Sequence, residues 1–353
     1  MKVAIVHDDL VQWGGAERVL LGLCEIYPDA PIYTSIYDQN NETLRNLFGS
    51  RKVITSFLKK IPASSKLYKT LMPFYPLAFE QFNFDEYDLV ISHTTRFAKG
   101  IITKPHTKHI CYMHTPPRFL WHLSERGNYG FGEFLMSKLR IYDAISANRV
   151  DVYLAGSKNA KKRIEKIYKR DSKVLYPFVD LERFKNIESF NGEYFLVVSR
   201  LNKYKRVELA VQACLELGLP IKVIGAGPEM NNLVKIGGQV EFLGELDDEM
   251  LVQVMAGCQA LIISGIEDFG LTALEAQALG KSVIAYRYGG ALETVIDGKT
   301  GILFDTQTVE SIKEAIKRLK SLNLQPHNCW ENAQHFSKEK FIQNFQAAVA
   351  SLV

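Results

Sequence analysis

Short apolar runs alternate with helical patterns along this chain, and this alternation constrains the fold more than any other feature of the sequence. A strand, a helix and a second strand in succession form the repeating unit of a parallel sheet covered by helices. In the first half of the chain, the predicted strands cover residues 3–6, 89–92, 110–113 and 152–155, and the predicted helices cover 16–26 and 159–168. The sequence therefore predicts an α/β fold.

A second series of the same kind follows, with strands at 194–199, 221–224, 240–242, 260–263 and 283–285 and a helix at 207–217. Pro177 interrupts the pattern between the two series and indicates a linker. The 353 residues suffice for two domains of ordinary size. We predict one parallel-sheet α/β domain over residues 1–178, a second over 179–336 and a helical C-terminal segment over 337–353.

Composition narrows the class of partner and the compartment. The chain has 43 basic and 39 acidic residues, so its net charge does not indicate a nucleic-acid partner. Its five cysteines lack metal-ligand spacing, and their odd number argues against a disulfide framework. The N-terminal apolar run is too short for a signal peptide, and no run has membrane-spanning length. We expect a cytoplasmic protein, with the inner face of the cytoplasmic membrane as an optional location.

Two glutamates, Glu267 and Glu275, lie eight residues apart around a Phe269-Gly270-Leu271 turn. An apolar run precedes this motif and helix formers follow it, so Gly270 is expected to open a helix. The unpaired N–H groups and the dipole of a helix start attract an anion such as a phosphate ester. Two carboxylates beside it suit hydrogen bonds to the hydroxyls of a ribose and a sugar. The alternative is an ordinary helix whose glutamates are solvated.

The E-x7-E spacing with F-G-L between the glutamates resembles the signature of the retaining glycosyltransferases of family 4. That family has the GT-B fold, in which two Rossmann-like parallel-sheet domains face each other across a cleft. The resemblance implies that Glu267 binds sugar hydroxyls, that Glu275 binds the nucleotide ribose, and that the C-terminal helix crosses back to the first domain. It also implies a donor-binding role for Asp268, Phe269, Gly270, Leu271 and Thr272. Asp268 stands where many members of the family have glycine.

A cation pair follows the strand that opens the second domain. Arg200 and Lys205 lie beyond its carboxyl end, where ligands bind in open α/β sheets. A guanidinium and an ammonium there could neutralise a diphosphate leaving group, and the resembled family has both at this spacing. A basic loop in solvent is the alternative. Gly225 lies in a G-x-G-P turn similar to one in the same family, and we count it among the donor-binding residues.

The first domain has two motifs that follow predicted strands. Gly14 and Gly15 lie before the first helix, where the resembled family has a glycine-rich loop bordering the donor phosphates and the acceptor. We place Trp13 beside them on the acceptor side. His114 begins an H-T-P-P-R segment, which resembles the subgroup that builds lipopolysaccharide and related glycans, often from GDP-mannose.

By that resemblance His114 orients the donor sugar, and we place Arg118 on the acceptor side. The other candidate histidines, among them His7 and His93, have no such context in the sequence. A buried structural histidine is the alternative for His114.

The chemistry expected from these residues needs neither a metal nor a cofactor. No D-x-D run of the kind that holds a divalent metal is present, so Arg200, Lys205 and the helix start at Gly270 would stabilise the leaving diphosphate. We expect transfer of a hexose, with mannose from GDP-mannose as the first choice and a UDP-sugar as the alternative. An epimerase or hydrolase on the same scaffold and a non-catalytic binding protein are the rival classes.

The composition of residues 51–77 indicates what kind of acceptor the protein could use. Their first part, 51–69, has six Lys or Arg and no Asp or Glu, interleaved with apolar residues. Such a composition is typical of a membrane surface, and an irregular lid with a solvated basic face is an equal alternative. Peripheral membrane contact would favour a saccharide linked to polyprenyl diphosphate as the acceptor.

Overall fold

The computed structural model describes residues 1–123, 132–190 and 192–351. The chain divides into two compact units, one formed by Met1–Tyr176 with Ile342–Val353 and the other by Pro177–Phe341. The C-terminal helix α14 (Lys338–Ala350) therefore leaves the second unit and ends in the first, where Phe345 packs edge-on against Tyr27. The last two residues of the predicted segment 337–353 lie outside the described residues.

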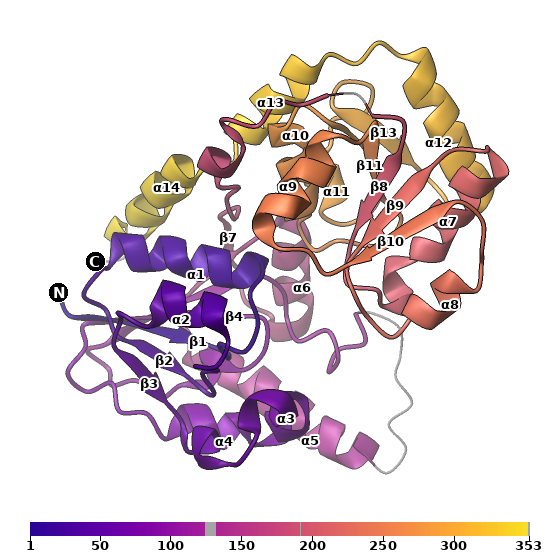
Figure 1. The fold of residues 1–353 in the computed structure, drawn as a ribbon. Coiled ribbons are helices and arrows are strands. Elements are labelled where there is room, and N and C mark those ends of the chain that lie inside the picture. The colour runs from indigo at the N-terminus through magenta and orange to yellow at the C-terminus, as the bar shows by residue number, and fades with distance from the viewer. Residues whose placement is uncertain (124–131, 191, 352–353) are drawn as a thin grey trace. The chain divides into compact units, whose positions relative to one another are not determined.

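The first unit is built on a parallel sheet of seven strands within the described residues (Figure 1). The strands follow the order β3-β2-β1-β4-β5-β6-β7 across the sheet. Their bounds are β1 Val3–His7, β2 Ile32–Thr34, β3 Val53–Thr55, β4 Leu89–Thr94, β5 Lys108–Met113, β6 Val152–Ala155 and β7 Lys173–Val174. The helices are α1 Gly15–Ile26, α2 Glu42–Phe48, α3 Ser64–Leu71, α4 Tyr75–Glu80, α5 Glu133–Ser146 and α6 Lys158–Tyr168.

Alternate residues of these strands face opposite sides of the sheet. On one side, Val6 and Val90 pack with Tyr75 and Phe79 of α4 in one continuous apolar cluster. The alternate positions, which include His7 and His93, therefore face the other side. Both histidines are buried, so this second side places polar groups inside the unit as well as apolar ones.

The second unit has a parallel sheet of six strands within the described residues, in the order β10-β9-β8-β11-β12-β13. The strands are β8 Phe195–Val198, β9 Ile221–Ile224, β10 Val240–Gly244, β11 Ala260–Ile263, β12 Ser282–Tyr286 and β13 Gly301–Phe304. The helices besides α14 are α7 Val207–Glu216, α8 Met230–Val234, α9 Asp248–Ala256, α10 Leu271–Ala278, α11 Ala291–Thr294, α12 Val309–Ser321 and α13 Pro326–Gln334.

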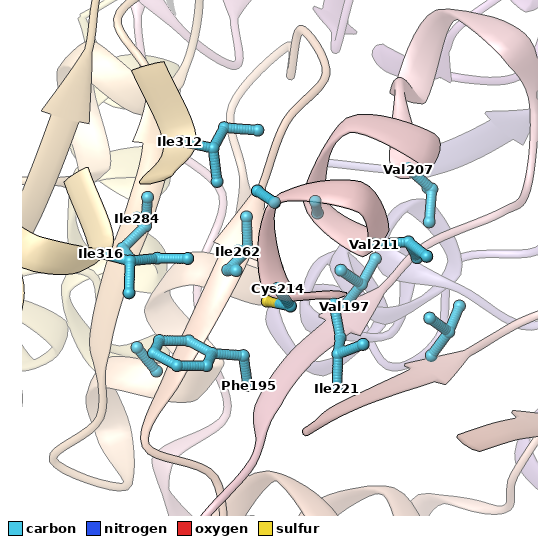
Figure 2. Close-up of a cluster of buried hydrophobic side chains, with 14 of the residues drawn as sticks. Phe195, Val197, Val207, Val211, Cys214, Ile221, Ile262, Ile284, Ile312 and Ile316 are labelled. Atoms are coloured by element: carbon cyan, nitrogen blue, oxygen red, sulfur yellow. The ribbon is translucent and has the colours of Figure 1, made fainter. Parts of the chain in front are cut away.

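Figure 2 shows the core of the second unit on one face of its sheet. Phe195 and Ile262 project from the strands toward Cys214 of α7 and toward Ile312 and Ile316 of α12. All five side chains are buried. Burial of this kind stabilises a domain by about 1.5–3 kcal/mol for each large apolar side chain. The two parallel sheets with covering helices confirm the predicted α/β fold class.

The strand order reverses once in each sheet. In the first unit the chain runs outward from β1 through β2 to β3 and then resumes on the other side of β1 at β4. In the second unit the same reversal separates β8 from β11. Crevices outside the carboxyl ends of such neighbouring strands are where open α/β sheets bind ligands.

The segment 51–77 consists largely of regular secondary structure, unlike the irregular lid considered from the sequence. It contributes β3 to the edge of the sheet and then forms a short 3-10 turn (Phe57–Lys60), the helix α3, a second turn (Met72–Phe74) and the start of α4. Sequence periodicity missed β3 because a strand of three residues is too short to show alternation. Of the two alternatives for this segment, the irregular lid is therefore wrong in calling the segment irregular.

A buried ion pair joins two segments of the first unit. Lys99 Nζ donates to Asp143 Oδ1, and both side chains are fully buried. Asp143 Oδ2 also accepts from Trp121 Nε1 at 2.7 Å and from the Tyr168 hydroxyl at 2.8 Å. The carboxylate therefore ties α5, α6 and two loops together, and every charge in the cluster has a partner.

We predict that Lys99→Met destabilises the protein by about 3–5 kcal/mol, because it leaves the Asp143 carboxylate buried without its counter-charge. Denaturant unfolding followed by circular dichroism measures the loss. The double variant Lys99→Met/Asp143→Asn should recover part of it. Lys2→Met is the control, because Lys2 forms an ion pair with Glu86 in which the two side chains are 68% and 66% exposed. Loss of such an exposed pair should leave the unfolding midpoint unchanged. Equal midpoints for Lys99→Met and Lys2→Met would contradict the prediction.

Candidate active site

The loop after β11 in the second unit ends in the predicted helix start. Gly270 has φ 99°, a left-handed conformation that favours glycine, and α10 begins at the next residue. The N-cap residue is Gly270 itself, which has no side chain with which to cap the helix start. The first N–H groups of a helix have no partner within it, so they remain available for an anionic ligand. The prediction that Gly270 opens a helix is confirmed.

Glu267 lies in that loop and forms an ion pair with Lys205. Lys205 Nζ donates to Glu267 Oε1 at 2.5 Å, and the two side chains are 13% and 24% exposed. Lys205 follows β8 and Glu267 follows β11, so the pair spans the two strands at which the sheet order reverses. The structure therefore brings together a cation and a carboxylate that the sequence predicted separately.

Gly265 explains how the two loops approach so closely. A Cβ at this position would lie 2.5 Å from the Cα of Lys205 and 2.8 Å from its carbonyl oxygen. Ser264 Oγ donates to the carbonyl oxygens of Lys205 and Arg206, at 3.2 and 2.7 Å. Sequence reasoning missed both residues, because a single glycine and a serine at a strand end carry no distinctive signal.

Arg200 is exposed, and among the described residues no carboxylate pairs with it. Gly225 packs against the backbone of Ser199, the residue before Arg200. A Cβ on Gly225, whose φ is 124°, would lie 1.9 Å from the carbonyl oxygen of Ser199. Leu201 N also donates to the carbonyl oxygen of Ala226 at 2.8 Å. The glycine turn thus supports the backbone of the Arg200 loop, which is a structural task beside the donor-binding role expected for Gly225.

The residues around Gly270 differ in what they can offer a ligand. The ring of Phe269 is 7% exposed and packs edge-on against Phe336, so only its backbone remains for a donor contact. Asp268, Leu271 and Thr272 are partly exposed.

Glu275 lies on α10 and pairs with an arginine that sequence reasoning missed. Arg183 donates to Glu275 Oε1 at 3.0 Å and also pairs with Asp248 at 3.2 Å. The Glu275 side chain is only 14% exposed, so a ribose would share its carboxylate with Arg183. Nothing in the sequence around Arg183, near the start of the predicted second domain, separates it from an ordinary surface arginine.

The glycine motif of the first unit forms the start of α1. Gly14 is its N-cap with extended backbone, and Gly15 is its first residue. A Cβ on Gly14 would lie 3.3 Å from Glu17 Oε2, so the glycine leaves room for that buried carboxylate. The guanidinium of Arg18 stacks over the ring of Trp13 at 4.9 Å from its centroid.

His114 follows β5 and is partly exposed. Its backbone N–H donates to the carbonyl oxygen of Thr94 at 3.1 Å. Its Nε2 lies 2.7 Å from Nε2 of His93, whose Nδ1 lies 2.9 Å from Nδ1 of His7. His7 and His93 have no such context in the sequence, but the fold places His93 beside His114, and strand pairing places His7 beside His93. Arg118 lies in the same loop and is partly exposed.

Two further observations concern ligands and membranes. Across the described residues, no three side chains of the metal-binding types gather in a way that could hold a metal ion. In the same part of the chain, every helix is too short or too polar to cross a bilayer.

Comparison with known proteins places these features in a family. Residues 13–183 match the family model Glycosyltransferase Family 4, and residues 178–336 match Glycosyl transferases group 1. An uncharacterized glycosyltransferase of Methanocaldococcus jannaschii is 31% identical over 216 residues, which are 55% of this chain. The chain spans about half the length of that relative, 55% of it.

A second relative and a solved structure of similar fold match over more of their length. The alpha-1,3/1,6-mannosyltransferase ALG2 of Kluyveromyces lactis is 24% identical over 378 residues, covering 84% of this chain and 71% of that protein. The Anabaena protein HepE, crystallised in complex with UDP, is 20% identical with a TM-score of 0.74, covering 99% of this chain and 100% of that one. The two family models together extend from residue 13 to residue 336, and the chain belongs to the family 4 glycosyltransferases of GT-B fold.

Proposed function

We propose that this protein transfers a hexose from a nucleoside diphosphate sugar to a saccharide acceptor. The observation that carries the proposal is the Lys205–Glu267 pair beside the uncapped start of α10. Together with the exposed Arg200, these groups offer two cations, the backbone N–H groups of a helix start and a carboxylate within one strand-end region. That set matches the charges and hydroxyls of a diphosphate sugar.

The proposed chemistry uses these groups to stabilise the leaving nucleoside diphosphate. Negative charge that develops on the diphosphate is met by Arg200, Lys205 and the helix start, without a metal ion. Glu267 binds hydroxyls of the transferring sugar, and Glu275, held by Arg183, binds the ribose. His114 orients the sugar. We propose transfer with retention of configuration, through same-face attack by the acceptor hydroxyl, whose proton passes to the leaving phosphate.

For the donor we propose GDP-mannose. The relative ALG2, a mannosyltransferase that aligns with 84% of this chain, supports a mannosyl donor. A UDP-sugar is the second candidate, since the structural neighbour HepE was crystallised with UDP. A nucleotide-sugar epimerase or hydrolase would share the donor site and differ in needing no saccharide acceptor. Product formation that depends on an added acceptor separates transfer from both of these reactions.

We predict selective binding of GDP and GDP-mannose in a calorimetric panel of GDP, UDP, ADP and their sugar conjugates without metal. Arg200→Ala should weaken the preferred nucleotide about 10–100-fold, the equivalent of about 1.5–3 kcal/mol for a charge-assisted hydrogen bond. Glu275→Ala should weaken it as well, through the ribose. Lys203→Met, which removes an exposed charge from the same loop, is the control. Preference for UDP would overturn the donor, and binding of no nucleotide would overturn the function.

We predict that Lys205→Met lowers kcat about 10²–10³-fold, the loss seen when a group aimed at developing charge is removed. The rate is measured as release of the nucleotide product at saturating concentrations of donor and acceptor. Glu267→Gln should also lower kcat, because it weakens both the contact to the sugar and the support of Lys205. A Lys205→Met enzyme with unchanged kcat and a raised KM would mean that Lys205 binds the ground state and the transition state equally, which would contradict the prediction.

For the acceptor we propose a saccharide on polyprenyl diphosphate at the membrane surface, contacted through residues 51–77. The exposed apolar side chains in this segment are Phe57, Leu67, Phe74 and Leu77, with exposures from 39% to 59%. Lys66 and Lys69, both exposed, lie on the same helix as Leu67. Apolar side chains beside lysines suit the interface of an anionic bilayer.

We predict that Lys66→Gln/Lys69→Gln weakens binding to vesicles of mixed anionic and zwitterionic lipid. Each lysine near such a surface contributes about 1 kcal/mol, so the pair corresponds to about thirtyfold. Co-sedimentation with the vesicles measures the effect. Lys317→Gln/Lys320→Gln, an equally spaced and exposed pair on α12, is the matched control. Equal binding by the two double variants would remove the segment from the proposed membrane contact.

A further inference from the structure

Three histidines of the first unit form a line across neighbouring strands. His7 ends β1 and is the register partner of His93 on β4. His114 comes directly after Met113 of β5, and Met113 is the register partner of Thr94 on β4. Ring nitrogens join the three residues at 2.9 and 2.7 Å. His7 and His93 are buried, so the contact between them is protected from water, whereas the contact of His93 with His114 is partly buried.

The direction of the first hydrogen bond follows from a backbone contact. His7 Nδ1 lies 2.9 Å from Nδ1 of His93 and also 3.3 Å from the carbonyl oxygen of His93. A carbonyl oxygen can only accept, so this contact favours the form of His7 that has a proton on Nδ1, which its cationic form always has. Nδ1 of His93 therefore accepts.

The second hydrogen bond follows from the first. Burial, with smaller effects from His114 and His7, holds the pKa of His93 well below its ordinary value, so His93 is neutral and has a single ring proton. That proton is on Nε2, because Nδ1 accepts from His7. Nε2 of His93 then donates to Nε2 of His114, and the ring proton of a neutral His114 must be on its Nδ1.

An acidic group lies at the far end of the line. Glu17 Oε1, from the first turn of α1, lies 3.6 Å from His7 Nε2, within ion-pair range. Asp8 and Asp9 add negative charge nearby, and Arg96 is paired with Asp9. Burial opposes a charge on His7, yet Glu17 and the two aspartates outweigh it and raise the pKa of His7. The cationic form of His7 is the form that donates toward His93.

We propose that Glu17, His7 and His93 are positioning residues that hold the His114 ring as its Nδ1–H tautomer. In that state His114 presents an N–H donor to a sugar or phosphate oxygen, whereas the opposite tautomer would turn an acceptor toward the same oxygen. What His114 contacts rests on the proposed function. The tautomer itself rests on the contacts within the first unit, together with a neutral His93 and a charged His7, and does not depend on the proposed function.

The line of hydrogen bonds reverses when His7 loses its charge. A neutral His7 is best placed with its remaining proton on Nε2, facing the Glu17 carboxylate, and its Nδ1 then accepts from His93. His93 in turn accepts from Nε2 of His114, and His114 loses its Nδ1 proton. Because the pKa of His7 is raised, the donor tautomer of His114 persists below that pKa and is lost as the pH rises through it.

The test is ¹⁵N NMR of the full-length protein labelled in its histidine rings, without substrate. His114 is assigned by the signal missing from His114→Gln. We expect Nδ1 of His114 to be protonated at low and neutral pH and to lose its proton at a midpoint that falls to lower pH in Glu17→Gln. His109→Gln is the control, because His109 is equally buried but is held by Ser92 and the carbonyl oxygen of Arg149.

A His114 ring protonated on Nε2 while His7 is charged would overturn the proposal, as would a midpoint unmoved by Glu17→Gln. Each result is read from the unliganded protein, so it does not depend on transferase activity. In the enzyme assay, the basic limb of the kcat/KM profile should move to lower pH in Glu17→Gln and stay in place in His109→Gln. A correct tautomer with an unmoved profile would contradict the proposed role of His114 in transfer and leave the hydrogen-bonded line intact.

Discussion

The buried carboxylate of Asp8 organises the carboxyl ends of strands β1 and β4 in the first unit. It follows β1 and accepts from the backbone N–H groups of Thr95, Phe97 and Ala98, at 2.7 to 3.0 Å. Although burial opposes its charge, Arg96 and these N–H groups hold the pKa of Asp8 below its ordinary value. An ionised group without water must be fully hydrogen-bonded, so the turn after β4 has little freedom to leave the end of β1. The alignment of the histidines on these strands depends on this contact.

In the second unit, glycine residues allow the loops after neighbouring strands to meet. Two loops that follow β8 and β11 must meet for Lys205 to reach Glu267, and their backbones come too close for a side chain at Gly265. Gly225 permits an equally close contact beneath Arg200. In one unit a charge holds two strand ends together, and in the other the absence of side chains lets them approach. Both arrangements occur where the strand order reverses.

Much of this architecture could be predicted from local pattern. The strands at 221–224 and 260–263 have the predicted bounds, and α10 begins at the predicted glycine. The strands β2 and β3 were missed because three residues cannot establish a period. Arg183 was missed for another reason. An arginine becomes informative only when its partner is known, and Glu275 is 92 residues away in the chain.

The sequence by itself determined the class of fold, the two series of strands and helices, and the positions of the main motifs at strand ends. These follow from periodicity and from glycine, which act over a few residues. Only the tertiary structure decided which strand ends are neighbours. Lys205 meets Glu267 across 62 residues, and His7 meets His93 across 86. Such meetings depend on strand order and register, which are set by packing of the whole sheet, so no local spacing encodes them.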